Sequence, residues 1–207
     1  MTLNIDTVYL HLDNSQYARL RYIASYKNTF SYTNTFKSSN AKSFDFTYTL
    51  SIYEIDGFSF KVKQFKRGTY RLELYGLHQY TRNNKLKTND TLKKLFPSLK
   101  HAYIKRLDLC TDSKHKPQTK KLKTKKLKNY KGTIYHNLYN KNYFSSYIYN
   151  KQLKNNLSTI LWRSEYSFRT ILRSKKWRFQ LKDLNKLIKR CERFVNNLEQ
   201  RANSLNV

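Results

Sequence analysis

Acidic residues and residues that interrupt regular structure are both scarce in this chain. Its 207 residues include 13 Asp and Glu, 4 Gly and 2 Pro. Set against 42 Lys and Arg, the shortage of acids leaves a net charge of +29. Such a charge attracts polyanions, so nucleic acid or an anionic membrane surface is the expected partner. A flexible basic tail is excluded for most of the chain, because 18 Tyr and 12 Phe accompany the low Gly and Pro content.

Cysteines are few, and paired histidines and long apolar runs are missing. Cys110 and Cys191 are too few and too far apart for a disulfide framework or a cysteine zinc site. The 5 His are scattered without metal-binding spacing. No stretch approaches the roughly 20 apolar residues of a membrane span, and residues 1–14 do not look like a signal peptide. We therefore expect a soluble, cytoplasmic protein with reduced cysteines.

The first 76 residues are rich in alternating β-branched and aromatic positions, which are typical of strands. Asp56-Gly57 lies between two such runs and predicts a two-residue hairpin turn, because both turn positions need a positive φ. Gly76 would end the last of these strands. Strands are predicted over 7–12, 18–25, 43–53 and 69–75.

A short helix is predicted over residues 88–96. Asn89 or Asp90 can cap its N-terminus, three apolar residues share one face, and Pro97 would end it. A strand over 103–110 follows directly.

Residues 113–164 contain no acid and mix 13 Lys and Arg with Tyr and Phe. This combination suits single-stranded nucleic acid, because cations hold phosphates and rings stack on bases. The most Lys-rich part, 113–131, predicts an exposed basic loop, although a merely solvated loop would have the same composition. The residues expected to contact phosphates are Lys121, Lys123, Lys125, Lys126 and Lys128.

Strands are predicted again over 132–137, 143–150 and 158–168, and an amphipathic helix begins at about residue 175. This helix either packs on the sheet or mediates dimerisation. The sequence therefore predicts an α+β protein with an antiparallel β-sheet core, a short helix in the middle and a long amphipathic C-terminal helix. One domain would span 1–207, with a β-rich half to about residue 112, the basic loop 113–131, and strands and helix over 132–207.

Three of the predicted strands have one polar face each, because side chains alternate along a strand. The first offers Arg106, Asp108 and Asp112. The second offers Tyr147 and Tyr149 with Lys151, and the third offers Arg163 and Glu165. If the strands are neighbours, these side chains gather at one place on the sheet.

Carboxylates beside a tyrosine suit one reaction on DNA. A divalent metal on hard oxygen ligands polarises the scissile phosphate. The Tyr hydroxyl attacks the phosphorus and leaves a covalent phosphotyrosine and a free 3′-OH, while Lys or Arg stabilises the developing charge. The same residues also allow a structural interpretation, in which Arg–acid pairs follow a sheet face and Tyr fills space.

Three segments of the chain resemble motifs of a known family. They are residues 106–112 (RLDLCTD), 147–151 (YIYNK) and 162–166 (WRSEY). In order and spacing they resemble the R-[ILV]-D-[ILV]-x-x-D, [RK]-x-Y-[DNE]-K and R-x-E motifs of rolling-circle plasmid replication initiators, the Rep_trans family, and of related phage initiators. The resemblance covers about residues 45–172.

The resemblance implies a metal-dependent, site-specific DNA endonuclease and strand transferase that starts rolling-circle replication. Asp108 and Glu165 match acidic motif positions and would bind Mg²⁺ or Mn²⁺. Tyr149 matches the nucleophile and Lys151 the motif lysine. Tyr147 stands where the family has a basic residue, so it is a rival nucleophile.

Nucleic-acid contacts are expected from Arg106, Arg163 and Tyr147, besides the lysines of the basic loop. The partner would be single-stranded or supercoiled origin DNA and not a membrane. The sequence also allows a homodimer and a host helicase as further partners. Two other functions also stay open: a non-catalytic nucleic-acid-binding protein, and a conjugative relaxase with the same chemistry.

Overall fold

The computed structural model describes residues 3–37, 43–65, 68–80, 86–87, 90–117, 128–130, 133–136, 144–169 and 178–204. Most of its strands form one antiparallel sheet of ten, in the order β2-β3-β4-β5-β1-β8-β12-β11-β10-β9. Strands from both halves of the chain meet at its centre, where β1 and β8 pair. The α+β class with an antiparallel sheet and a long C-terminal helix is confirmed.

The strands of this sheet have the following bounds. In spatial order they are β2 (Ser25–Lys37), β3 (Ser43–Ile55), β4 (Phe58–Phe65), β5 (Thr69–Tyr75), β1 (Asn4–Leu12), β8 (Tyr103–Ser113), β12 (Trp162–Arg169), β11 (Phe144–Asn150), β10 (Thr133–His136) and β9 (Lys128–Tyr130). A separate short ladder joins β6 (Gln79–Tyr80) to β7 (Leu86–Lys87). The helices are α1 (Asn14–Ile23), α2 (Thr91–Leu99), α3 (Lys151–Asn155) and α4 (Leu184–Ser204), with a 3₁₀ turn, η2 (Leu181–Asp183), before α4.

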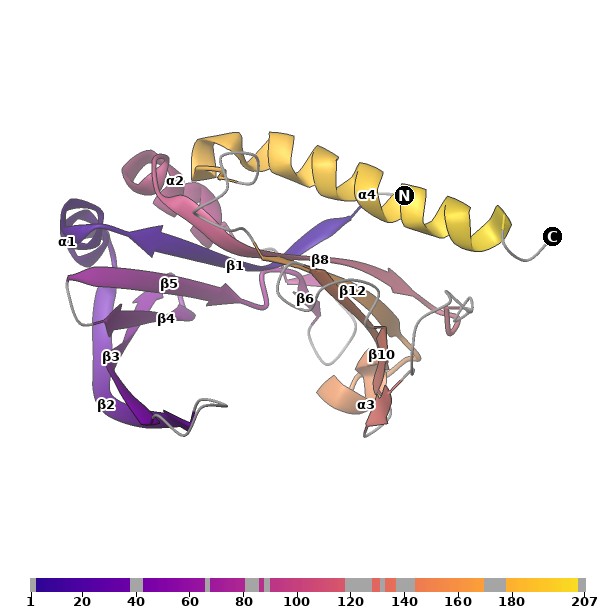
Figure 1. Cartoon of the computed structure of the whole chain (residues 1–207), viewed down its shortest axis with the longest axis horizontal. Coiled ribbons are helices and arrows are strands. Elements are labelled where there is room, and N and C mark those ends of the chain that lie inside the picture. Colours follow the sequence, from indigo (N-terminus) through magenta and orange to yellow (C-terminus); the bar gives the residue numbers. More distant parts are fainter. Residues whose placement is uncertain are drawn as a thin grey trace.

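The helices α1, α2 and α4 cover one face of the sheet (Figure 1). The core lies between them and the sheet, where alternate strand residues such as Leu10, Leu72 and Leu107 are fully buried. From α4, Leu187 and Cys191 pack into it at a spacing of four. The two ends of the sheet, β2–β3 and β10, bend away from these helices (Figure 1). The opposite face therefore forms a concave surface that carries the polar residues.

The strand predicted over 18–25 is wrong, because α1 occupies residues 14–23. Asp13 caps this helix by accepting a hydrogen bond from the Gln16 backbone N–H at 2.8 Å, and Gln16 Oε1 accepts the Asp13 N–H at 3.1 Å. This capping box is a helix signal that the local alternation masked. Leu20 anchors the helix in the core.

The helix predicted over 88–96 is shifted to Thr91–Leu99, and Pro97 lies inside it instead of ending it. Leu95 and Leu99 are fully buried on either side of Pro97. Their burial offsets the hydrogen bond that proline cannot donate. Asp90 is the N-cap residue, and Asn89 lies outside the described residues.

The predicted hairpin is confirmed, with a positive φ of 48° at Asp56 and 75° at Gly57. The strands over 132–137 and 143–150 are confirmed with shorter bounds, and the third begins at Trp162. In the basic loop, residues 118–127 lie outside the described part, including Lys121, Lys123, Lys125 and Lys126. Lys128 begins a strand, so the loop is shorter than predicted. Among the described helices, none is both long and apolar enough to cross a membrane.

Candidate functional site

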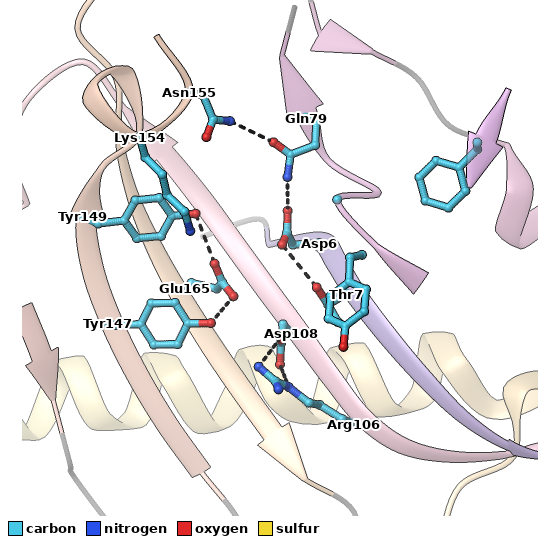
Figure 2. Close-up of a pocket in the computed structure, with 13 residues that line it drawn as sticks. Asp6, Thr7, Gln79, Arg106, Asp108, Tyr147, Tyr149, Lys154, Asn155 and Glu165 are labelled. Carbon is cyan, nitrogen blue, oxygen red and sulfur yellow. Dashed lines mark hydrogen bonds and ion pairs between the residues drawn. The ribbon is translucent and has the colours of Figure 1, made fainter. Parts of the chain in front are cut away.

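The three strands with polar faces are neighbours, as the site prediction requires. The strand β12 pairs with β8 and β11, so that Ser167 faces Asp108 and Tyr147 faces Glu165 across the sheet. Asp108, Glu165, Tyr147 and Tyr149 line one cavity of about 570 Å³. Figure 2 shows them pointing into the same space on the face opposite α4. We call these four residues the open cluster.

The strand β1 adds Asp6 and Thr7 to this cavity, which the sequence analysis missed. The register between β1 and β8 shifts between Ile5 and Thr7. A bulge of this kind inserts an extra residue, so two neighbouring side chains reach one face. The sequence does contain a signal for Asp6, because an acid inside an apolar, β-branched run is unusual in a chain with only 13 acids.

The Glu165 carboxylate accepts hydrogen bonds from both tyrosines, from the Tyr147 hydroxyl to Oε1 and from the Tyr149 hydroxyl to Oε2 at 3.3 Å. Burial is the main cause that raises the pKa of Glu165 to about 7, and the charges of Asp6 and Asp108 act in the same direction. Burial and the Glu165 charge raise the pKa of both phenols well above 10. Neither tyrosine therefore ionises by itself, and Glu165 is the base within reach of both protons.

Asp108 is held by Arg106, which reaches its two oxygens at 2.8 and 2.7 Å. Burial raises the pKa of Asp108 even against this pairing. The Arg106 side chain keeps 24% of its surface exposed and lines the cavity, which fits the predicted contact with nucleic acid.

Arg163 lies in a different environment. Its guanidinium binds Asp112 at 2.7 and 2.8 Å, Asp6 at 2.6 Å and the His78 carbonyl oxygen at 2.8 Å. The side chain is fully buried, so it offers nothing to a phosphate from outside. The predicted nucleic-acid contact does not fit this position, and Arg163 instead holds β1, β8 and residue 78 together.

Lys151 is also drawn into this buried group. The strand β11 ends at Asn150, whose side chain caps α3 by accepting the Leu153 N–H at 3.1 Å. Lys151 thus begins a helix and leaves the strand alternation. Its Nζ donates to the His78 carbonyl at 3.2 Å, and its side chain is 1% exposed. Burial and the Arg163 charge lower the pKa of Lys151 to about 8. We call Arg163, Asp112, Asp6 and Lys151 the closed cluster.

Lys154, one turn further along α3, takes the place expected for Lys151. Its Nζ lies 4.4 Å from the centre of the Tyr149 ring, and it lines the cavity from an exposed position. Gln79 and Asn155 complete this wall, with Gln79 donating to Asp6 at 3.3 Å and accepting from Asn155 at 3.2 Å (Figure 2). Sequence spacing could not identify them because they lie outside the three strands with polar faces, Gln79 in β6 and Asn155 in α3.

Two groups of side chains could be considered for a metal. Among the described residues, His78, Cys110 and Asp112 bring one ligand atom each to within 4.8 Å of one another. Asp112 is already bound by the Arg163 guanidinium, and the neighbouring Lys151 adds a second positive charge. Two buried cations make this position unfavourable for a metal ion.

The second group is Asp6, Asp108 and Glu165. Burial and the charge of Asp6 raise the pKa of Asp108 and of Glu165. All three carboxylates line the cavity and offer hard oxygen donors, and Asp6 is in addition bound by the Arg163 guanidinium at 2.6 Å. They do not form a closed cage, which suits Mg²⁺ because this ion keeps several waters and substrate oxygens. Arg106 competes for Asp108, so a bound cation would share that carboxylate with it.

Comparison of the chain with models of protein families, with curated proteins and with solved structures found no match. The functional proposal therefore depends on the geometry of the cavity and on the three short motifs.

Proposed function

We propose that this protein is a metal-dependent DNA endonuclease and strand transferase that nicks origin DNA through a phosphotyrosine and starts rolling-circle replication. One observation carries the proposal: two tyrosine hydroxyls share one carboxylate of raised pKa inside an acid-lined cavity. This cavity opens on the concave face of a protein with a net charge of +29. We expect the protein to act in the cytoplasm.

The Tyr149 hydroxyl oxygen attacks the scissile phosphorus, and its proton passes to Glu165. A bond forms between phosphorus and the tyrosine oxygen, and the bond from phosphorus to the 3′ oxygen breaks. The 3′ oxygen takes a proton from water and leaves as a hydroxyl. Lys154, close to the Tyr149 ring, stabilises the negative charge that develops on the attacking oxygen.

Asp108, Asp6 and Glu165 would supply the oxygen donors for Mg²⁺ or Mn²⁺. A bound divalent cation would polarise the scissile phosphate. Arg106 holds Asp108 in place and adds a positive charge beside the phosphate.

Tyr149 is favoured over Tyr147 because Lys154 lies beside its ring. The two rings stack with centres 6.2 Å apart, so a modest shift of the DNA would exchange them. Tyr147 is therefore the rival nucleophile.

The test is incubation with supercoiled and single-stranded DNA taken from the region that flanks the gene, with Mg²⁺, Mn²⁺ or EDTA. We expect a covalent protein–DNA adduct on a denaturing gel with either metal and none with EDTA. Tight binding without an adduct under every condition would contradict the proposal and favour a non-catalytic nucleic-acid-binding protein. An adduct that supports DNA transfer between cells but no replication of the circle would assign a conjugative relaxase.

A further inference from the structure

A continuous series of rings and cations leads from the cavity to the far edge of the sheet. Its members, the ring–cation track, are Arg106, Tyr9, Arg71, Phe65, Tyr48, Tyr32 and Phe30. The Arg106 guanidinium lies 5.1 Å from the Tyr9 ring centre, and Arg71 lies 5.5 Å from Tyr9 and 5.4 Å from Phe65.

The outer half of the track consists of rings alone. Phe65 and Tyr48 lie 6.2 Å apart, Tyr48 and Tyr32 stack at 5.5 Å, and Tyr32 and Phe30 lie 6.4 Å apart. These separations are those of interacting aromatic pairs. The track is therefore unbroken from β8 to β2.

The strand register places the whole track on the concave face. Tyr9 pairs with Arg106, Tyr48 pairs with Phe65, and Tyr32 pairs with Tyr48. Directly paired residues of antiparallel strands point to the same side. From β8 to β2 the track covers about 24 Å, at about 4.8 Å between neighbouring strands. Figure 1 shows β2 and β3 bending away from the helices, which leaves this face uncovered by them.

Charge along the track is mainly positive. Lys61 and Lys63 flank the rings, with Lys61 5.9 Å from the Tyr75 ring and Lys63 5.3 Å from Tyr48. The acid of this stretch, Glu73, is 1% exposed and is neutralised by Lys63 at 3.1 Å and Arg71 at 2.6 Å. At the outer end Phe30 and Tyr32 each keep 41% of their surface exposed.

We propose that the ring–cation track binds the single-stranded nucleic acid that continues from the nucleotide in the cavity. Bases stack on the exposed rings, and the neighbouring cations hold the phosphates. A second copy of this chain is a poor occupant, because two such basic faces repel each other at +29 per chain. This proposal depends on the proposed function in one respect only, which is the assignment of a nucleotide to the cavity.

The test measures binding without cleavage. A fluorescein-labelled thymidine oligonucleotide of about 20 nucleotides is titrated in EDTA with the wild type and with a Phe30→Leu, Tyr32→Leu double variant. Leucine keeps apolar volume and removes the stacking surface. We expect binding at least about 25-fold weaker, because two stacked bases are lost and each contributes roughly a 5- to 150-fold factor. The salt dependence should stay unchanged, since the cations that hold the phosphates are all retained.

Tyr22→Leu is the matched control, because Tyr22 lies on α1 over the helix-covered face and is 93% exposed. Its affinity should equal that of the wild type. Equal losses in control and double variant, or no loss in either, would overturn the proposal. So would a change of oligomeric state in sedimentation without a change of affinity, which would make the face an interface between copies.

A second measurement uses the unaltered protein and does not depend on the variants folding. Oligonucleotides with bromodeoxyuridine are photocrosslinked, and the adducts are mapped by mass spectrometry. Crosslinks at the rings of the track, such as Tyr32 or Tyr48, support the proposal, and crosslinks confined to residues outside the track contradict it. Because both assays run without metal, they separate the track from the nicking activity: either can fail while the other succeeds.

Discussion

The open and closed clusters lie next to each other on the same sheet face, and each contains two carboxylates. In the closed cluster, Arg163 donates hydrogen bonds to Asp112, Asp6 and a backbone carbonyl. Although burial alone would raise the pKa of Asp112, hydrogen bonds from Arg163 and His78 lower it far below its ordinary value. The Arg163 charge is paired with both acids, and Asp6 also borders the cavity.

In the open cluster, burial outweighs the hydrogen bonds and positive charges that would lower the pKa of the carboxylates. Burial raises the pKa of Glu165 to about 7 and also raises the pKa of Asp108, so these carboxylates hold their negative charge at a cost. They border a cavity, and a proton or a divalent cation would relieve that cost. Carboxylates on one sheet face are thus neutralised by Arg163 in the closed cluster, whereas those of the open cluster stay costly to ionise beside a cavity.

The largest expected effect is the loss of the covalent adduct in Tyr149→Phe. The change removes one oxygen whose hydrogen bond to Glu165 is long, 3.3 Å, so the fold should remain intact. Adduct formation with origin DNA is followed on denaturing gels, with Tyr147→Phe as the matched control. If the adduct survives in Tyr149→Phe and disappears in Tyr147→Phe, then Tyr147 is the nucleophile. Survival in the double variant would leave the open cluster without a catalytic tyrosine.

Glu165→Gln should lower the rate of cleavage by about 10²–10⁴-fold, because the proton acceptor is lost. Its thermal stability at pH 8 should be equal to that of the wild type or higher, since a charge that the fold disfavours is removed. Asp112→Asn is the same exchange in the closed cluster, and there stability should fall, because a charge that Arg163 favours is removed. Changes of the same sign in the two variants would remove the distinction between the clusters.

Arg163→Met should lower the free energy of unfolding by about 3–5 kcal/mol, because Asp6 and Asp112 lose their buried partner. Arg106→Met should cost less, about 1–3 kcal/mol, because Arg106 is partly exposed and Asp108 can take up a proton. Urea denaturation of both variants measures the difference. If Arg106→Met lowers the free energy of unfolding more than Arg163→Met does, then the Arg106–Asp108 pair contributes more to the stability of the fold than the closed cluster does.

Lys151→Met tests the closed cluster through pH. Because the pKa of Lys151 in the fold is about 8, below its ordinary value of 10.5, the unfolded chain binds more protons between these values. Wild-type stability should therefore gain, as pH rises from about 8 to 10.5, a contribution that the variant lacks. Below that window the variant should be the more stable protein, by on the order of a few kcal/mol. Parallel curves would show that Lys151 is not held as a buried cation.

Period-two alternation predicted correctly which side chains share a face at the centre of the sheet. It placed Asp108, Tyr149 and Glu165 on one face, and the pairing of β8, β12 and β11 brought them together. This works because neighbouring antiparallel strands keep their side-chain parity over several residues.

The sequence-based predictions were wrong where the alternation of side chains along a strand is interrupted. A register shift in β1 turns Asp6 into the cavity, and the Asn150 cap starts α3 before Lys151, so Lys154 reaches Tyr149 instead. The same weakness explains α1, where local alternation outweighed the capping box of Asp13 and Gln16. Bulges and caps depend on a few backbone contacts, which hydrophobic patterning does not register.

The smallest effect concerns phosphate binding outside both clusters. Lys121→Gln, Lys123→Gln and Lys125→Gln together should flatten the slope of log K against log[salt] by about 0.7–0.9 for each phosphate that is no longer neutralised, because fewer counterions are released on binding. The measurement is a titration of single-stranded DNA at several salt concentrations. The matched control neutralises Lys182, Lys186 and Lys189, which are exposed near and along α4 on the opposite side of the sheet. If the control flattens the slope as much as the basic-loop variant does, then DNA is attracted by net charge alone, and the basic loop has no special share in binding.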